Sequence, residues 1–143
     1  MNNPIQVAVA IIQRKKQDNS IEYFLTKRLK KLHQGGKWEF PGGKVEDDET
    51  VTQALARELK EEVAIEVLTC QPFIQIDHLY DGPKTSKHVY LNVFIVDNFL
   101  GEPSAQEGQD QIWCSLEQLV TLNFPEANHA IIEKLLEKPT TKF

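Results

Sequence analysis

The chain has 143 residues, 41% of them hydrophobic and 26% charged, which suits one globular domain with a sizeable core. Its net charge of −5 argues against binding to a nucleic acid polymer but is compatible with a free nucleotide whose charge is balanced by a metal ion. The early apolar run 5–12 is too short to cross a membrane and has no basic lead, while Cys70 and Cys114 lack any metal-binding spacing; we therefore expect a cytoplasmic protein with free thiols and no zinc site.

The first part of the chain predicts short strands. Ile5–Gln13 is rich in β-branched residues and is expected to be a strand buried on both faces. The polar segment 15–20 predicts a turn, and Ile21–Lys27 then predicts the second strand of a hairpin. Residues 38–43 form a further short strand that runs into a turn, where paired glycines let the backbone approach a ligand closely.

A basic, glycine-terminated segment at 28–36 connects these strands and is expected to be a surface loop. Lysines in such a loop commonly do no more than keep the protein soluble. The functional alternative is contact with substrate phosphates, for which Arg28 is the strongest candidate because its planar fork can bind a phosphate through two hydrogen bonds.

A helix is predicted after Thr50, which can serve as N-cap with Gln53 completing a capping box. At roughly 100° per residue, an apolar stripe forms from every fourth residue, and a group of glutamates borders it. The stripe consists of Leu55, Leu59 and Val63, and the glutamates are Glu58, Glu61 and Glu62.

Three glutamates on one sector of a helix repel each other, and their pKa values would rise beside a buried stripe unless a cation were present. One interpretation is that the glutamates form an acidic face exposed to solvent, as in most glutamate-rich helices. The other is a site for a hard divalent cation, which prefers oxygen ligands; Mg²⁺ in particular is often held by a few carboxylates together with substrate phosphates.

The second half of the chain predicts two long strands, then a shorter strand and two helices. The strands are 66–79 and 86–98, around a turn at 81–83, and 112–115 after a polar loop; the helices are 116–120 and 124–138. Strands with helices outside them predict an α/β sandwich around a mixed sheet. We expect one domain over 1–143 and, as the default, a monomer.

Residues 43–65 match a longer pattern: glycine, five residues, Glu49, seven residues, and then Arg57-Glu58-Leu59-Lys60-Glu61-Glu62 before two further residues and Ile65. This arrangement resembles the Nudix box, G-x5-E-x7-R-E-U-x-E-E-x-G-U, where U is a bulky aliphatic residue. The resemblance implies a Nudix-type α/β/α sandwich with a mixed sheet, in which the box supplies a loop-helix-loop. Ala64 departs from the pattern, because the family usually has glycine there, but no ligand is lost.

The resemblance also assigns roles to individual residues. It implies Mg²⁺ as cofactor, with Mn²⁺ as a substitute ion, and catalysis by attack of water on a polyphosphate. Glu58 is the candidate general base, Arg57 would orient a carboxylate, and Glu49 would brace the loop. The implied metal ligands are Gly42, Glu58, Glu61, Glu62 and Glu107, and the implied catalytic residues are Glu58, Glu61 and Arg57.

Several segments outside the box resemble the MutT-like branch of this family, whose members hydrolyse 8-oxo-dGTP and so prevent misincorporation during DNA replication. They are 37–44, 101–103, 107–109, Trp113 with 115–116, and 124–128. Lys87 stands where that branch has arginine, which puts one polar contact in doubt. The implied substrate-binding residues are Asn128, Arg28, His33, Glu39, Phe40, Pro41 and Gly42.

The hydrogen-bonding groups of the Asn128 side chain suit recognition of an oxidised purine. Guanine presents two acceptors, N7 and O6, and oxidation at C8 places a hydrogen on N7. A carboxamide, with one C=O and one NH₂, then complements the oxidised edge and mismatches the normal one. The simpler interpretation of an asparagine at a helix start is local backbone bonding.

Two other functions remain open at this level. The chain could hydrolyse another nucleoside polyphosphate, such as a dinucleoside polyphosphate or an unoxidised nucleotide. It could also bind nucleotides without cleaving them, although binding-only relatives tend to lose carboxylates of the box, and Glu49, Glu58, Glu61 and Glu62 are all present.

Overall fold

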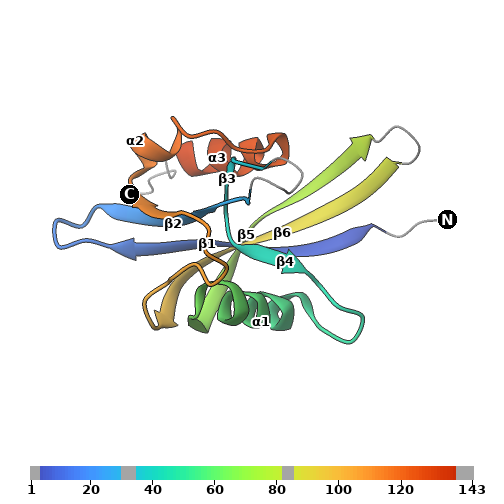
Figure 1. Cartoon of the computed structure of the whole chain (residues 1–143), viewed down its shortest axis with the longest axis horizontal. Coiled ribbons are helices and arrows are strands. Elements are labelled where there is room, and N and C mark those ends of the chain that lie inside the picture. Colours follow the sequence, from blue (N-terminus) through green and yellow to red (C-terminus); the bar gives the residue numbers. More distant parts are fainter. Residues whose placement is uncertain (1–3, 30–34, 82–85, 138–143) are drawn as a thin grey trace, which may run out of the picture.

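The computed structural model describes residues 4–29, 35–81 and 86–137. Seven strands form one mixed sheet with the order β3-β2-β1-β6-β5, while β4 pairs with β1 and β7 with β2 (Figure 1). The strands are β1 (Ile5–Lys15), β2 (Ile21–Lys27), β3 (Trp38–Glu39), β4 (Gly42–Lys44), β5 (Glu66–Asp81), β6 (Ser86–Leu100) and β7 (Gln111–Cys114). The helices are α1 (Val51–Val63), α2 (Leu116–Leu119) and α3 (His129–Leu136), with a 3₁₀ turn η1 (Glu126–Asn128) before α3.

Strand β1 lies at the centre and pairs along both of its edges. One edge runs parallel to β6, with Val9 opposite Val93. The other edge is shared: β4 pairs with residues 7–9 and β2 with residues 12–15, both antiparallel. Between these two stretches, the Ala10 amide donates to the Pro41 carbonyl at 2.8 Å. The segment from β3 to β4 therefore crosses from β2 to β1 at the middle of the sheet.

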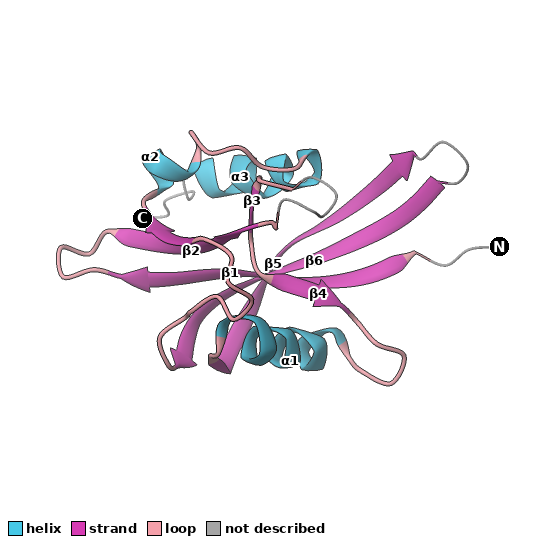
Figure 2. Cartoon of the chain, viewed as in Figure 1, coloured by secondary structure: helices cyan, strands magenta, loops and turns pink. Residues whose placement is uncertain are grey.

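The helices cover both faces of this sheet, α1 on one side and α2 with α3 on the other (Figure 2). Side chains of β1 alternate between the two layers, as the period of a strand requires. Ala8, Ala10 and Ile12 pack in the cluster that contains α1, whereas Val9 and Ile11 pack in the cluster that contains α2 and α3. The predicted mixed-sheet α/β sandwich and the burial of this strand on both faces are confirmed.

The last helix differs from its prediction over 124–138. Phe124 and Pro125 precede it, residues 126–128 form a 3₁₀ turn, and α3 begins only at His129. Pro125 takes an extended conformation, and its carbonyl accepts from the Asn128 amide at 3.0 Å, which is the short-range bond of a 3₁₀ turn. The predicted turn at 81–83 lies largely outside the described residues.

Helix α1 begins as predicted, with the Thr50 side chain accepting from the Gln53 amide at 3.1 Å and the Gln53 side chain accepting from the Thr50 amide at 2.9 Å. It ends at Ala64, whose φ of 61° lies in the left-handed region. A left-handed alanine costs about 1–2 kcal/mol relative to glycine, because its Cβ approaches the following carbonyl oxygen. The helix exit that suits glycine is therefore kept, at the expense of strain.

Replacing Ala64 with glycine should therefore stabilise the protein. Relief of strain exceeds the extra chain entropy that glycine loses on folding, so we expect a gain of about 0.5–1 kcal/mol and a rise in Tm of about 2–3 °C. Ala56→Gly, at an exposed position inside α1, is the matched control and should lower stability by about 1 kcal/mol. Thermal unfolding followed by circular dichroism would measure both; a loss of stability in Ala64→Gly would contradict the strain argument.

Candidate active site

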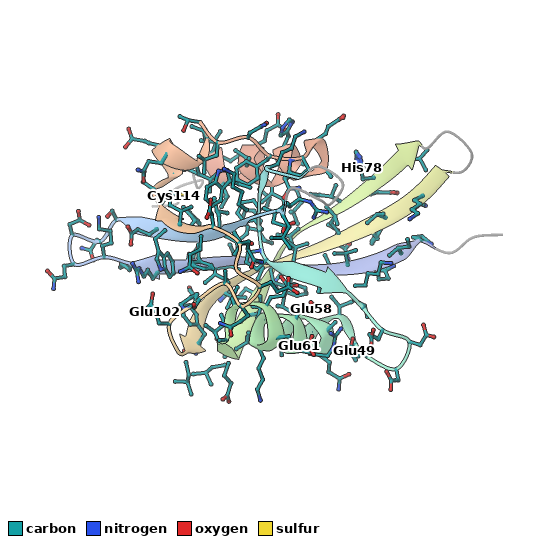
Figure 3. The ribbon with its side chains drawn as sticks, viewed as in Figure 1. Glu49, Glu58, Glu61, His78, Glu102 and Cys114 are labelled. Carbon is teal, nitrogen blue, oxygen red and sulfur yellow. The ribbon has the colours of Figure 1, made fainter. Side chains whose placement is uncertain are left out.

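The guanidinium of Arg57 is the centre of an ion-pair network on α1. It binds Glu49 through two bonds, Nε to Oε2 at 2.6 Å and Nη2 to Oε1 at 2.9 Å. Its Nη1 lies 3.0 Å from Glu58 Oε2 and 3.4 Å from Glu61 Oε1, and its Nη2 donates to the Lys44 carbonyl at 3.1 Å. One cation thus joins the helix, the loop before it and the end of β4. Figure 3 labels Glu49, Glu58 and Glu61, the three glutamates that it contacts.

Glu49 is the other fixed point of this network. Its Oε1 also accepts from the Glu46 amide at 2.9 Å, so the carboxylate holds the loop and Arg57 together. These hydrogen bonds, those from Arg57 foremost, lower the pKa of Glu49 to about 2. Glu49 is therefore ionised at neutral pH.

Glu58 lies in the angle between α1 and β4, with only 15% of its side chain exposed. A Cβ added at Gly43 would overlap the Glu58 carboxyl group, so the absence of a side chain at this glycine makes room for the carboxylate. At Gly42 an added Cβ would overlap the Ala8 carbonyl of β1. Gly42 therefore allows the close pairing of β4 with β1, whereas a side chain at Gly43 would force the Glu58 carboxylate to move.

Glu62 faces Glu58 across one turn of the helix. Burial, a hydrogen bond with Glu58 and the negative charges of Glu58 and Glu39 raise its pKa to about 9, while a backbone hydrogen bond with Gly42 opposes the shift. Two half-buried carboxyl groups in contact require a proton or a cation between them. Since oxygen donors in negative excess suit Mg²⁺ or Mn²⁺, these residues fit a hard divalent cation.

This arrangement predicts a characteristic dependence of stability on pH. A native pKa above the unfolded value means that the folded state holds the extra proton, so the metal-free protein loses stability as pH rises from about 4.5 toward about 9. A divalent cation replaces that proton, and its stabilising effect should grow over the same range.

We expect the rise in Tm caused by saturating Mg²⁺ to be about 3 °C or more larger at pH 8.5 than at pH 6. Glu62→Gln should abolish most of this difference, because it removes the group that titrates. Differential scanning calorimetry with and without EDTA gives the comparison. An Mg²⁺ effect that does not change with pH would count against the proton–cation exchange.

The loop 101–110 lies against the end of α1. The Ser104 amide donates to the Val63 carbonyl at 2.9 Å and the Gln106 amide donates to the Glu62 carbonyl at 3.0 Å. These bonds satisfy carbonyls that a helix end leaves without partners. Glu107 follows directly, and its charge contributes to the raised pKa of Glu39, which is caused first by burial and is opposed by Arg28. The loop thus brings Glu107 to the same region as the box carboxylates.

The other end of the site lies where β3 meets the segment before α3. The Trp38 amide donates to the Asn123 carbonyl at 2.8 Å, and the rings of Phe40 and Phe124 stack with centroids 5.5 Å apart. Arg28 forms an ion pair with Glu39 at 2.8 Å, and each side chain is 28% exposed. The segment 39–42, which was predicted to bind substrate, therefore reaches from this end to β4 beside α1.

Asn128 lies on η1, four residues after Phe124, and is only partly buried. Within the described part of the chain its side chain makes no capping hydrogen bond to α3. The carboxamide therefore does not cap α3, which is one form of the local backbone bonding considered above. Its amide and carbonyl groups can instead meet a ligand.

The structure brings together many of the predicted residues but not all of them. Glu61 is 62% exposed and is tied to Arg57 rather than to Glu62. Among the described residues, no three acidic, cysteine or histidine side chains already stand close enough to hold an ion. His33 lies outside the described residues. Two contacts of this region, the Lys44 carbonyl with Arg57 and the Gln111 side chain with the Ala105 amide, depend on the tertiary fold and were not predictable from the sequence pattern.

Comparison with known proteins places the chain in context. The model of the NUDIX domain matches residues 3–136. The 8-oxo-dGTP diphosphatase of Escherichia coli K12 is 42% identical over 132 residues, which cover 92% of this chain and 95% of that protein. The CTP pyrophosphohydrolase of the same strain is 35% identical, covering 92% and 91%.

Solved structures agree with the sequence matches. A MutT structure from a study of Aliivibrio salmonicida and Vibrio cholerae superposes with a TM-score of 0.75 at 36% identity, covering 94% of this chain and 98% of that one. In the described residues, no helix is long and apolar enough to span a membrane. With the box carboxylates on α1 and β4 beside them, and the domain model matching nearly the whole length, the chain belongs to the Nudix family.

Proposed function

We propose that the protein is a nucleotide-pool sanitising hydrolase that converts 8-oxo-dGTP to the nucleoside monophosphate and pyrophosphate and so prevents misincorporation during DNA replication. Two features together carry the proposal. A cluster of carboxylates around Arg57 lies at one end of segment 39–44, and near the other end lies Asn128, whose side chain makes no capping hydrogen bond to α3. Identity of 42% to a protein named 8-oxo-dGTP diphosphatase supports this choice of substrate.

The cluster would hold the polyphosphate end. Glu58, Glu62 and the Gly42 carbonyl would bind Mg²⁺, with Mn²⁺ as a substitute, and Glu107 and Glu61 would complete the set of ligands. When bound, the cation neutralises charge on the phosphate oxygens and makes water more acidic. Glu58 accepts the proton from the attacking water, and Arg57 keeps that carboxylate in place through its 3.0 Å contact.

The base would lie against segment 39–42 and Asn128. The Asn128 carboxamide donates to O6 and accepts from the N7 hydrogen that only the oxidised purine carries. Phe40, buried and stacked on Phe124, gives segment 39–42 a rigid apolar support. Arg28 and His33 would also contact the nucleotide. We propose that the enzyme is a cytoplasmic monomer that acts on free nucleotides and not on nucleic acid polymer, and the net charge of −5 supports the choice of free nucleotides.

A second candidate follows from one comparison. Because a CTP pyrophosphohydrolase is 35% identical over a similar length, hydrolysis of an unoxidised nucleotide is the main alternative. Both candidates share the phosphate chemistry and differ only at the base.

A competition assay separates them. Pyrophosphate release with Mg²⁺ would be measured for 8-oxo-dGTP, dGTP, CTP and a dinucleoside polyphosphate. The proposal expects kcat/KM for 8-oxo-dGTP to exceed that for dGTP by at least about 100-fold, since a site built on a hydrogen-bonded pair rejects its mismatch strongly. A ratio near one, or a preference for CTP, would remove the sanitising role.

A further inference from the structure

Two side chains of strand β7 contact the loop that carries Glu107, and both lie on the same face of the sheet. Gln111 and Trp113 are two residues apart on β7, so they share a side of the sheet. Trp113 packs with the cluster that contains α1. Both side chains therefore stand on the side of the sheet where the box helix lies.

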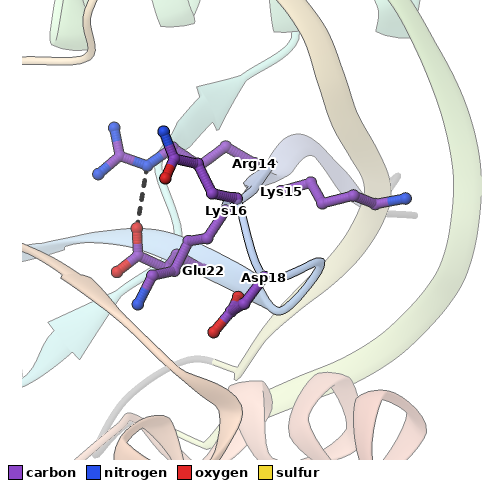
Figure 4. A pocket seen from close by; sticks show the side chains of 6 residues that line it. Arg14, Lys15, Lys16, Asp18 and Glu22 are labelled. Atoms are coloured by element: carbon purple, nitrogen blue, oxygen red, sulfur yellow. Dashed lines mark hydrogen bonds and ion pairs between the residues drawn. The ribbon is translucent and has the colours of Figure 1, made fainter.

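Trp113 holds the beginning of the loop. Its Nε1 donates to Glu102 Oε2 at 3.1 Å, and the guanidinium of Arg14 lies 3.8 Å from the centre of its ring. Arg14 also pairs with Glu102 at 3.4 Å and with Glu22 at 3.0 Å, the second being the pair drawn at the β1–β2 hairpin in Figure 4. The loop thus starts from a fixed point on the sheet.

Gln111 holds the middle of the loop. Its Oε1 accepts from the Ala105 amide at 2.6 Å. That amide lies between the two backbone amides that donate to α1, those of Ser104 and Gln106, and two residues before Glu107. The backbone of Gln111 is itself fixed, because it pairs with Thr26 of β2.

We propose that Gln111 is a positioning residue: by binding the Ala105 amide it sets where Glu107 stands relative to the carboxylates of α1. The inference rests on the proposed function, in which Glu107 takes part in binding the divalent cation. A side chain on a rigid strand fixes a loop more sharply than contacts within the loop do. Without the Gln111 side chain, the Ser104 and Gln106 amides still bond to α1, but Ala105 between them loses its hydrogen bond to β7.

The test compares the intact protein with Gln111→Ala and Gln111→Met, which lack the acceptor, and Gln111→Glu, which keeps one. Gln71→Ala is the matched control, because Gln71 is also an exposed glutamine on a strand, β5. Binding of Mn²⁺ alone is followed by its EPR signal, and kcat and KM are measured beside it. We expect the Mn²⁺ dissociation constant to rise about tenfold in the Ala and Met variants and less than threefold in the Glu variant, with KM for nucleotide within twofold.

A double-mutant cycle with Glu107→Gln makes the test specific. If Gln111 acts through Glu107, Gln111→Ala should have little further effect on Mn²⁺ binding in the Glu107→Gln background. An equal tenfold loss in both backgrounds would overturn the inference, as would a Glu107→Gln protein that binds Mn²⁺ normally. Either result could occur in a fully active hydrolase, whereas failure of the proposed function would appear as absence of Mg²⁺-dependent turnover in the wild type.

Discussion

Replacing Glu58 with glutamine should lower kcat for pyrophosphate release by about 10³-fold or more. The carboxylate is 15% exposed and held by Arg57, and glutamine keeps its shape while removing both the proton acceptor and the negative charge. KM should change far less, because most of the nucleotide is bound elsewhere. The fold should survive, since glutamine has the same size and can still form a hydrogen bond with the Glu62 side chain.

Glu66→Gln provides the control for this variant. Glu66 is an exposed glutamate at the start of β5, outside the network of Arg57, and its replacement should leave kcat within twofold. Single-turnover kinetics at saturating Mg²⁺ would show whether the loss lies in the chemical step. A Glu58→Gln enzyme that retains a tenth of wild-type kcat would rule out a role for this residue in proton transfer.

Asn128→Ala should reduce selectivity much more than turnover. A good two-bond contact to a base edge discriminates by about 1–3 kcal/mol, so we expect the ratio of kcat/KM for 8-oxo-dGTP over dGTP to fall about 10–100-fold. The rate with dGTP should change little, because the carboxamide does not complement its two acceptors. The Glu58 network at the other end of segment 39–44 should be unaffected.

Asn123→Ala is the matched control. Asn123 is exposed in the same segment and contributes its backbone carbonyl to Trp38, which the substitution leaves intact. Its selectivity should equal that of the wild type. Equal losses on both nucleotides in Asn128→Ala would mean that this residue supports the pocket without reading the base.

Local features of this fold follow from the order of residues. The capping box of Thr50 and Gln53 and the buried stripe of α1 are determined by neighbours along the chain, and both are confirmed. The same holds for the hairpin of β1 and β2, since alternation and a polar turn are short-range signals. The left-handed conformation of Ala64 could not be read from the residue itself, because alanine rarely adopts it.

Features that depend on distant residues could not be predicted in this way. The division of one edge of β1 between β4 and β2 follows from which strands pair, and several registers satisfy the same hydrophobic pattern. The contact of Ala105 with Gln111 and the stacking of Phe40 on Phe124 depend on that topology. Segment 126–128 is a 3₁₀ turn because Pro125 takes an extended conformation, a choice that helix periodicity does not reveal.

The most direct test is a crystal structure with Mn²⁺ and a non-hydrolysable analogue of 8-oxo-dGTP. We expect anomalous density for Mn²⁺ within coordination distance of Glu58 and Glu62, the phosphates beside it, and the purine edge paired with the Asn128 carboxamide. Density for the metal and the analogue at another surface, with those two carboxylates turned to solvent, would contradict the account.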